Sequence, residues 1–148
     1  MPREIFTIGY EGASPDAFAT TLKDAGVAVV ADVRAVALSR KRGFSKSALR
    51  ESLETQGLGY RHYIALGTPK PGREAARAGD AASLRRIYCD EVLASAPALE
   101  ALEELVALAG EQPVCLLCFE RDPALCHRRL LTERLAARGF TAVDLFVP

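Results

Sequence analysis

The fold is decided by one stretch of sequence, which reads Pro113-Val-Cys-Leu-Leu-Cys-Phe-Glu-Arg-Asp-Pro-Ala-Leu-Cys-His-Arg-Arg129. The apolar run at 114–119 is typical of a strand buried on both faces. Asp122 and Pro123 then indicate a helix start, with a capping carboxylate followed by proline at the first helical position. Apolar residues at helical spacing continue until Gly139, where the helix is predicted to end. The stretch therefore predicts a strand, a turn and a helix.

The rest of the chain alternates in the same way between apolar runs and amphipathic segments. Further strands are predicted at 4–9, 27–31, 58–64 and 141–147, and further helices at 14–25, 45–56, 81–94 and 98–109. Segment 66–80 combines glycine, proline and mixed charge, which predicts a long loop or flap. We expect one α/β domain over residues 1–148, a doubly wound, mostly parallel five-stranded sheet with helices on both faces. The expected strand order is 3-2-1-4-5, with the ends of the first and fourth strands at the topological switch point.

The composition is that of an ordinary globular protein, with 49% apolar and 26% charged residues. Equal numbers of basic and acidic residues, 19 of each, argue against bulk electrostatic binding of nucleic acid but allow a local basic pocket. No apolar run approaches the roughly 20 residues of a membrane span, and the start of the chain shows no signal peptide. We therefore expect a cytoplasmic protein with no membrane partner, whose four cysteines are not structural disulfides.

Two cysteines are candidate catalytic thiols. Cys118 lies at the end of the focal strand and Cys126 near the start of the following helix. Free backbone N–H groups and the positive end of a helix lower a thiol pKa there, and the neighbouring His127 adds to that effect. The alternative is that these cysteines only pack, because cysteine is among the most buried residue types. For Cys89 and Cys115 packing is the favoured interpretation.

The predicted elements disfavour a metal site at these cysteines. Cys115 and Cys118 are three apart on a strand and therefore face opposite sides of the sheet. Cys126 and His127 are neighbours on the predicted helix, where successive side chains diverge by about 100°. We therefore predict neither a metal ion nor a cofactor. Iron or zinc held by Cys118, Cys126 and a histidine stays open as an alternative.

A second group of residues is suited to binding an anion. Arginine forks match phosphate and carboxylate, and a helix start adds N–H donors. The predicted ligand-binding residues gather at the carboxyl edge of the sheet: Tyr10, Arg34, Arg40, His127 and Arg128. The alternative for the arginines is that Asp32 pairs with one of them and holds the loop after its strand.

Two residues are candidate acid or base groups. Glu120 leaves the focal strand where a ligand would lie, whereas Asp122 is better explained as a helix cap. His62, on the third predicted strand, could act as a base near neutral pH. A structural role that satisfies its ring nitrogens is the alternative for His62.

Four ordered motifs cover essentially the whole chain: Thr7-Ile8-Gly9-Tyr10-Glu11-Gly12, then Asp32-Val33-Arg34 with Ser39-Arg40 and Phe44, then Gly59-Tyr60-Arg61-His62 with Leu66-Gly67, then Leu117-Cys118-Phe119-Glu120 with Cys126-His127-Arg128. In this order they resemble the domain of unknown function 488 family, which usually has proline at the place of Ala37. The resemblance implies an α/β domain whose motif residues form one site. It implies no particular reaction.

These residues leave three functions open. The first is an enzyme in which Cys118 or Cys126 is the nucleophile and the ligand is a phosphate-bearing small molecule or nucleic acid. The second is a non-catalytic module that binds the same nucleotide or nucleic-acid phosphate. The third is sulfur transfer, since a strand ending in Asp-Val-Arg and a later strand ending in cysteine look similar to rhodanese-like domains, where Cys118 would carry a persulfide.

Overall fold

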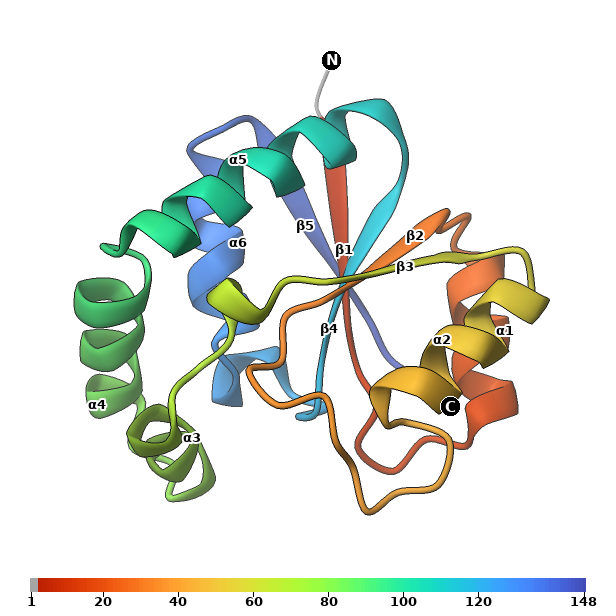
Figure 1. The fold of residues 1–148 in the computed structure, drawn as a ribbon, viewed down its shortest axis with the longest axis horizontal. Coiled ribbons are helices and arrows are strands. Elements are labelled where there is room, and N and C mark those ends of the chain that lie inside the picture. Colours follow the sequence, from red (N-terminus) through yellow and green to blue (C-terminus); the bar gives the residue numbers. More distant parts are fainter. Residues whose placement is uncertain (1–2) are drawn as a thin grey trace.

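Five short strands form a parallel sheet at the centre of the protein (Figure 1). The structure is a computed structural model, and it describes residues 3–148. The strands are β1 (Arg3–Gly9), β2 (Val29–Asp32), β3 (Gly59–His62), β4 (Val114–Cys118) and β5 (Phe140–Leu145). Every neighbouring pair runs parallel. The five predicted strands and the α/β fold class are confirmed.

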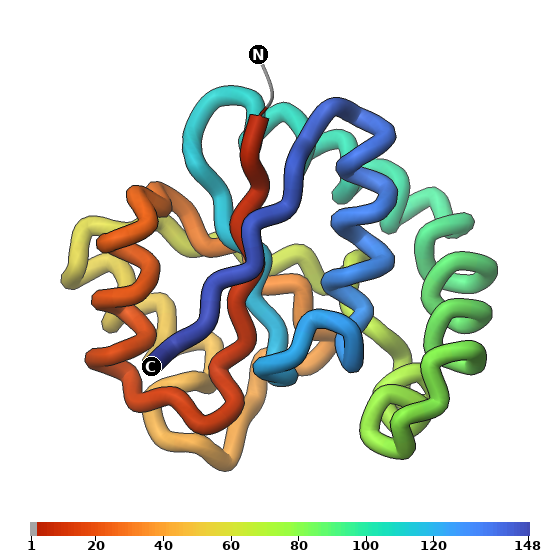
Figure 2. Tube along the Cα trace, turned by 180° about the vertical axis from the view of Figure 1, so that it is seen from behind, coloured from red at the N-terminus to blue at the C-terminus, as the bar shows by residue number. Residues whose placement is uncertain are grey.

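Helices cover both faces of this sheet. They are α1 (Pro15–Asp24), α2 (Lys46–Thr55), α3 (Lys70–Arg77), α4 (Ala81–Arg86), α5 (Ala96–Glu111) and α6 (Arg128–Ala136). Figure 1 shows α1 and α2 on one side of the strands and α3 to α6 on the other. Figure 2 shows the opposite view, in which β1 and β5 run side by side between α1 and α6. None of the helices within residues 3–148 has both the length and the apolar character to cross a membrane.

The strand order is β3-β2-β4-β1-β5, so the predicted order 3-2-1-4-5 was wrong in exchanging β1 and β4. The connection through α1 passes over β4 on its way from β1 to β2. The connection through α6 passes over β1 on its way from β4 to β5. Each crossover skips one strand, which the sequence pattern of a strand does not reveal. The exchange makes β4 the central strand, with β1 and β2 on either side.

Alternate residues of β4 face the two helical layers. Val114 and Leu116 belong to the apolar core beneath α5 and α6, whereas Cys115 and Leu117 belong to the core beneath α1 and α2. This period of two follows from the pleat of a strand buried on both faces. Cys115 is therefore a packing residue, and burial raises the pKa of its thiol far above the ordinary value.

The predicted flap at 66–80 was wrong in part, because it contains α3. Pro71 and Gly72 obscured this helix in the sequence. Pro71 lies in the first turn, where the missing N–H costs nothing. Gly72 and Ala75 face inward, so the helix packs through small residues.

The predicted continuous helix after Asp122 is interrupted. The Asp122 carboxylate accepts from the Ala124 N–H, but the turn that it caps is a short 3₁₀ helix, Pro123–Leu125. Cys126 then adopts an extended backbone, with φ −135° and ψ 149°. α6 begins only at Arg128, whose N–H donates to the Cys126 sulfur at 3.4 Å. The sulfur takes the place of a capping oxygen at the new helix start.

The predicted helix at 81–94 changes its winding along its length. It starts as α4 and continues as a π-helix, Ile87–Val92. The wider turn buries Tyr88 completely, and its hydroxyl donates to the Leu66 carbonyl at 2.8 Å. Such π segments are frequent at functional sites.

Candidate functional site

Three strands end at the same edge of the sheet and are tied together beyond their last ladder pairs. The Tyr10 N–H donates to the Cys118 carbonyl at 3.2 Å, and the Val33 N–H donates to the Leu117 carbonyl at 3.1 Å. The end of β4 is thus held from both sides, by the segments that follow β1 and β2. This arrangement fixes the backbone of Cys118 at the centre of the edge.

Gly9 permits a close approach at this edge. A Cβ atom at Gly9 would lie 1.7 Å from the Glu120 carbonyl oxygen, so only glycine fits. The same carbonyl accepts from Arg128 Nη1 at 2.7 Å. The backbone of Glu120 is therefore clamped between β1 and α6.

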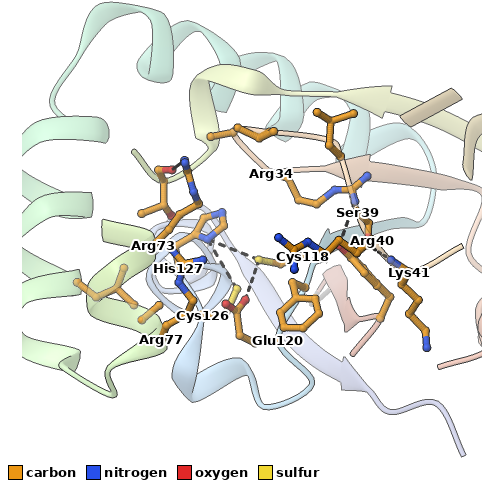
Figure 3. Close-up of a pocket in the computed structure, with 18 residues that line it drawn as sticks. Arg34, Ser39, Arg40, Lys41, Arg73, Arg77, Cys118, Glu120, Cys126 and His127 are labelled. Carbon is orange, nitrogen blue, oxygen red and sulfur yellow. Dashed lines mark hydrogen bonds between the residues drawn. The ribbon is translucent and has the colours of Figure 1, made fainter. Parts of the chain in front are cut away.

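Cys118, Cys126 and His127 form a buried cluster at the end of β4 (Figure 3). His127 Nδ1 lies 3.7 Å from Cys118 Sγ and 3.7 Å from Cys126 Sγ. The other ring nitrogen, Nε2, lies 2.8 Å from the Val33 carbonyl. A carbonyl only accepts, so Nε2 carries a proton and Nδ1 faces the two sulfurs. Glu120 Oε2 completes the group, 3.3 Å from Cys118 Sγ.

The members of the cluster shift one another's pKa values. Burial opposes ionisation of Cys118, yet a hydrogen bond from Cys126 and the charge of His127 hold its pKa well below the ordinary value. Burial and the neighbouring Cys118 raise the pKa of Cys126. Burial would lower the pKa of His127, but the charge of Cys118 raises it. Burial and the charge of Cys118 raise the pKa of Glu120 to about 7. The cluster therefore favours negative charge on Cys118.

A cavity of about 680 Å³ opens above the cluster, and Cys118, Glu120, Cys126 and His127 all line it. Besides Arg34, four cations line the same cavity: Arg40, Lys41, Arg73 and Arg77. Figure 3 shows the first two on one side of the cluster and the last two, from α3, on the other. Within residues 3–148 none of the four has a carboxylate within 4.0 Å. The cavity is therefore suited to an anionic ligand.

Arg34 lines the cavity but is occupied by protein groups. Its Nε and Nη2 donate to the Asp32 carboxylate at 2.9 and 2.7 Å, and its Nη1 donates to the Phe44 carbonyl at 2.7 Å. Burial would lower the pKa of Arg34, but the pairing with Asp32 raises it. These contacts favour the alternative stated above, in which the pair holds the loop after β2. Tyr10 also lines the cavity, with its ring stacked on Phe44 at 4.6 Å.

Two predicted site residues lie outside the cavity lining. Arg128 is fully buried beneath the cluster, where its backbone N–H donates to Cys126 Sγ and its guanidinium donates to the Glu120 carbonyl. His62 Nε2 lies 2.7 Å from the Arg34 carbonyl, which is a structural contact at the end of β3. The structure brings together Cys118, Glu120, Cys126, His127, Tyr10, Arg34 and Arg40.

The sequence interpretation missed three cations of the cavity. Lys41 is not among the predicted site residues, and Arg73 and Arg77 lie within the predicted flap. Arg73 and Arg77 are four residues apart, which would put both on one face of a helix and could have indicated a shared binding role. It has meaning only once residues 70–77 are recognised as a helix.

Cys118, Cys126 and His127 are also the residues that could hold a metal ion. Their donor atoms all lie within 4.8 Å of one another. The prediction against a metal assumed that Cys126 and His127 share a helix, and this assumption was wrong because the Cys126 backbone is extended. The expectation that Cys115 faces away from Cys118 is confirmed, since Cys115 lies in the core beneath α1 and α2.

Together, the fold and the cluster define an α/β protein with a cysteine–histidine centre at the carboxyl edge of a parallel sheet. Residues 14–135 match the family model described as Domain of unknown function DUF488, and the chain belongs to that family. Comparison with the curated proteins and with the solved structures gave no match. The resemblance drawn from the sequence motifs is confirmed.

Proposed function

We propose that this protein is an enzyme that acts on a phosphate-bearing small molecule of nucleotide size. The observation that carries the proposal is that cations without acidic partners and a cysteine–histidine–glutamate cluster line the same cavity. Binding groups and reactive groups thus face one ligand. Perturbed titratable groups that converge in a concave pocket are the usual sign of an active site.

The cations support recognition of phosphate. Arg73 and Arg77 project from α3, and Arg73 Nη1 donates to the carbonyl of Thr68, just before this helix, at 2.9 Å. Guanidinium forks bind phosphate oxygens through paired, charge-assisted hydrogen bonds. Thr68 lines the cavity too, and its buried hydroxyl has no hydrogen-bond partner within residues 3–148.

The cavity also has an apolar wall, which supports a ligand with a planar or apolar part. Val36, Leu38 and Phe119 are exposed and line it. The Phe119 ring meets the Tyr10 ring edge-on at 5.3 Å, which fixes its position. A nucleotide combines a phosphate with a base that can stack on such a ring. The volume lies within the usual range of small-molecule pockets, about 300–1,000 Å³.

A small ligand is favoured over nucleic acid. The chain has no net charge, and its unpaired cavity cations are confined to one concave site. Extended nucleic acid is bound by a basic surface that contacts many phosphates. Cytoplasmic location stays a prediction, and a reducing compartment would keep the thiols of the cluster available.

The reaction would take place at the cluster, with Cys118 and Cys126 at its centre and Glu120 beside Cys118. Glu120 is favoured over His62 as the acid or base, because its carboxylate lines the cavity and His62 does not. Persulfide transfer is less favoured. Cys118 Sγ faces the Glu120 carboxylate and the His127 ring, whereas a persulfide needs a ring of N–H donors.

Binding is tested by isothermal titration calorimetry with nucleoside mono-, di- and triphosphates, the parent nucleosides and inorganic phosphate. Arg77→Gln should weaken nucleotide binding about 10- to 150-fold, since a charged hydrogen bond contributes roughly 1.5–3 kcal/mol. Arg50→Gln is the matched control, because Arg50 is an exposed cation of α2 that does not line the cavity. Phe119→Ala should weaken binding of nucleotides but not of inorganic phosphate.

Turnover separates an enzyme from a binding module. Compounds that bind are incubated with the protein, and the products are identified by mass spectrometry. Cys118→Ser should still bind the ligand and should form no product. Binding by both proteins without product from either would favour the non-catalytic module. A wild-type protein that binds none of the phosphate compounds would overturn the proposal.

A further inference from the structure

We propose that Cys118, Cys126 and His127 bind a zinc ion whose fourth coordination position opens toward the cavity, beside Glu120. Binding would displace two protons from the cluster, so that the metal is held by two thiolate sulfurs and by His127 Nδ1. This inference deepens the proposed function. Only the binding of a ligand at the fourth position rests on that function. The site itself is argued from coordination geometry.

The distances within the cluster match a tetrahedral zinc site. With bonds of about 2.3 Å to sulfur and about 2.0 Å to nitrogen, tetrahedral geometry separates a sulfur and a nitrogen ligand by about 3.5 Å. His127 Nδ1 lies 3.7 Å from each of the two sulfurs. All three donor atoms lie within 4.8 Å of one another, and all three residues are buried. Two sulfurs and one imidazole form a donor set that favours zinc.

The surroundings orient the ligands as a metal site requires. The Val33 carbonyl holds the proton on His127 Nε2, at 2.8 Å, and so leaves the Nδ1 lone pair free for a metal. The Arg128 N–H donates to Cys126 Sγ at 3.4 Å, which stabilises a thiolate. Neither contact is needed for simple packing of a cysteine.

A buried charge beside the cluster favours negative charge on it. Arg128 is fully buried, and its Nε and Nη2 have no hydrogen-bond partner within residues 3–148. In the same part of the chain no carboxylate lies within 4.0 Å of it. A buried guanidinium is costly unless negative charge lies nearby. Because zinc replaces two protons, it leaves the charge of the cluster unchanged, and Arg128 is balanced equally by the ionised cluster with or without the metal.

The fourth position would make this a reactive rather than a purely structural site. Glu120, whose Oε2 lies 3.3 Å from Cys118 Sγ, lies beside the fourth position and is not counted as a ligand. Three protein ligands with an exchangeable fourth are typical of catalytic zinc, whereas structural sites are closed by four protein ligands. A phosphate oxygen or a water molecule in the cavity could take that position.

The metal content is measured first. Protein expressed with zinc in the medium is purified without chelator or metal-affinity resin, and its metals are counted by mass spectrometry. The expected content is about one zinc ion per chain. Cys118→Ser and Cys126→Ser should each lose most of it, whereas Cys89→Ser, at a half-buried cysteine outside the cluster, should keep it. Circular dichroism verifies that each variant is folded.

Cobalt provides a readout of the ligands themselves. Apoprotein, reduced and free of oxygen, is titrated with Co²⁺. Tetrahedral cobalt bound by two thiolates should give intense visible bands and a sulfur-to-metal charge-transfer band, which stoichiometric Zn²⁺ abolishes. Glu120→Gln should keep the charge-transfer band, because both sulfurs remain. Folded wild-type protein that retains no zinc and leaves Co²⁺ with the spectrum of the aqueous ion would overturn the inference.

Failure of this inference is distinguishable from failure of the proposed function. Arg77→Gln should lose nucleotide affinity and keep its zinc. If the wild type binds a nucleotide but neither zinc nor cobalt, the zinc site is rejected and the enzyme proposal stands. If it holds zinc but binds no phosphate compound, the zinc site stands and the proposed function is rejected.

Discussion

Asp32 is the residue on which the edge of the sheet depends most. It is fully buried, and its carboxylate accepts from Arg34 and from the Tyr60 hydroxyl. Burial and this hydrogen bond raise the pKa of Tyr60, so the hydroxyl remains a donor. Arg34 carries the contact on to the Phe44 carbonyl in the loop. The network therefore joins β2, β3 and the loop that carries Arg40.

Asp32→Asn should lower the free energy of unfolding by about 3–5 kcal/mol, because it leaves the buried Arg34 charge without its partner. Urea denaturation measures the loss. Glu54→Gln removes an exposed ion pair with Arg50 and should change stability by less than about 0.5 kcal/mol. Equal effects of the two substitutions would show that the buried pair has no special role.

Gly9→Ala tests the close contact beneath the cluster. The added methyl group would overlap the Glu120 carbonyl, so we expect a loss of about 1–3 kcal/mol and a displaced Glu120. Gly110→Ala in α5 is the matched control, because the only atoms near its Cβ belong to the flexible end of Arg3. The control should be neutral or stabilising by up to about 1 kcal/mol, from helix propensity. Urea denaturation again gives both values.

The helices and strands that the sequence predicts correctly are those whose residue pattern follows from burial and local capping. The apolar run of β4 and the capped, amphipathic α1 are read correctly because each local signal agrees with the tertiary structure. Ser14 caps α1 as expected, accepting from the Ala17 N–H. The placement of Cys118 and Glu120 at this edge also followed, since parallel strands end at a common edge.

The elements that were misread depend on contacts distant in sequence. The exchange of β1 and β4 is set by which strand each crossover skips. The extended backbone at Cys126 depends on a sulfur that caps α6, and proline and glycine concealed the small-residue face of α3. Both sulfurs reach His127 only because the helix is broken at Cys126. Helical spacing therefore could not predict that the two thiols and the imidazole lie together.

The π-helical segment is expected to support His127. The Tyr88 ring lies 5.0 Å from the His127 ring, between centroids, and its hydroxyl donates to Leu66. Tyr88→Phe should cost about 1–3 kcal/mol of stability by leaving the Leu66 carbonyl unpaired, and should keep the zinc. Tyr88→Leu removes the ring as well and should weaken zinc binding about tenfold. Competition with a colorimetric chelator measures the affinity, and equal zinc affinity in both variants would contradict this role.

For the whole molecule, the proposed zinc would connect the central strand to α6 and, through the Val33 carbonyl, to β2. A ligand present at a hundred times its dissociation constant stabilises the folded state by about 2.7 kcal/mol. Removal of zinc by a chelator should therefore lower the Tm by roughly 5–10 °C in differential scanning calorimetry. The Tm of Cys118→Ser should not respond to the chelator. An equal response of both proteins would mean that the chelator acts elsewhere.

The backbone hydrogen bonds that extend the sheet beyond its strands restrict the motion of the cavity floor. The amide protons of Tyr10 and Val33, bonded to β4 carbonyls, should exchange with deuterium only when the sheet itself opens. The floor of the cavity is then rigid before any ligand arrives. On ligand binding, conformational entropy would be lost mainly by α3 and by the loop after β2, which carry the cavity cations. Ligand residence time would be governed by those two segments, and the reactive groups would need no rearrangement.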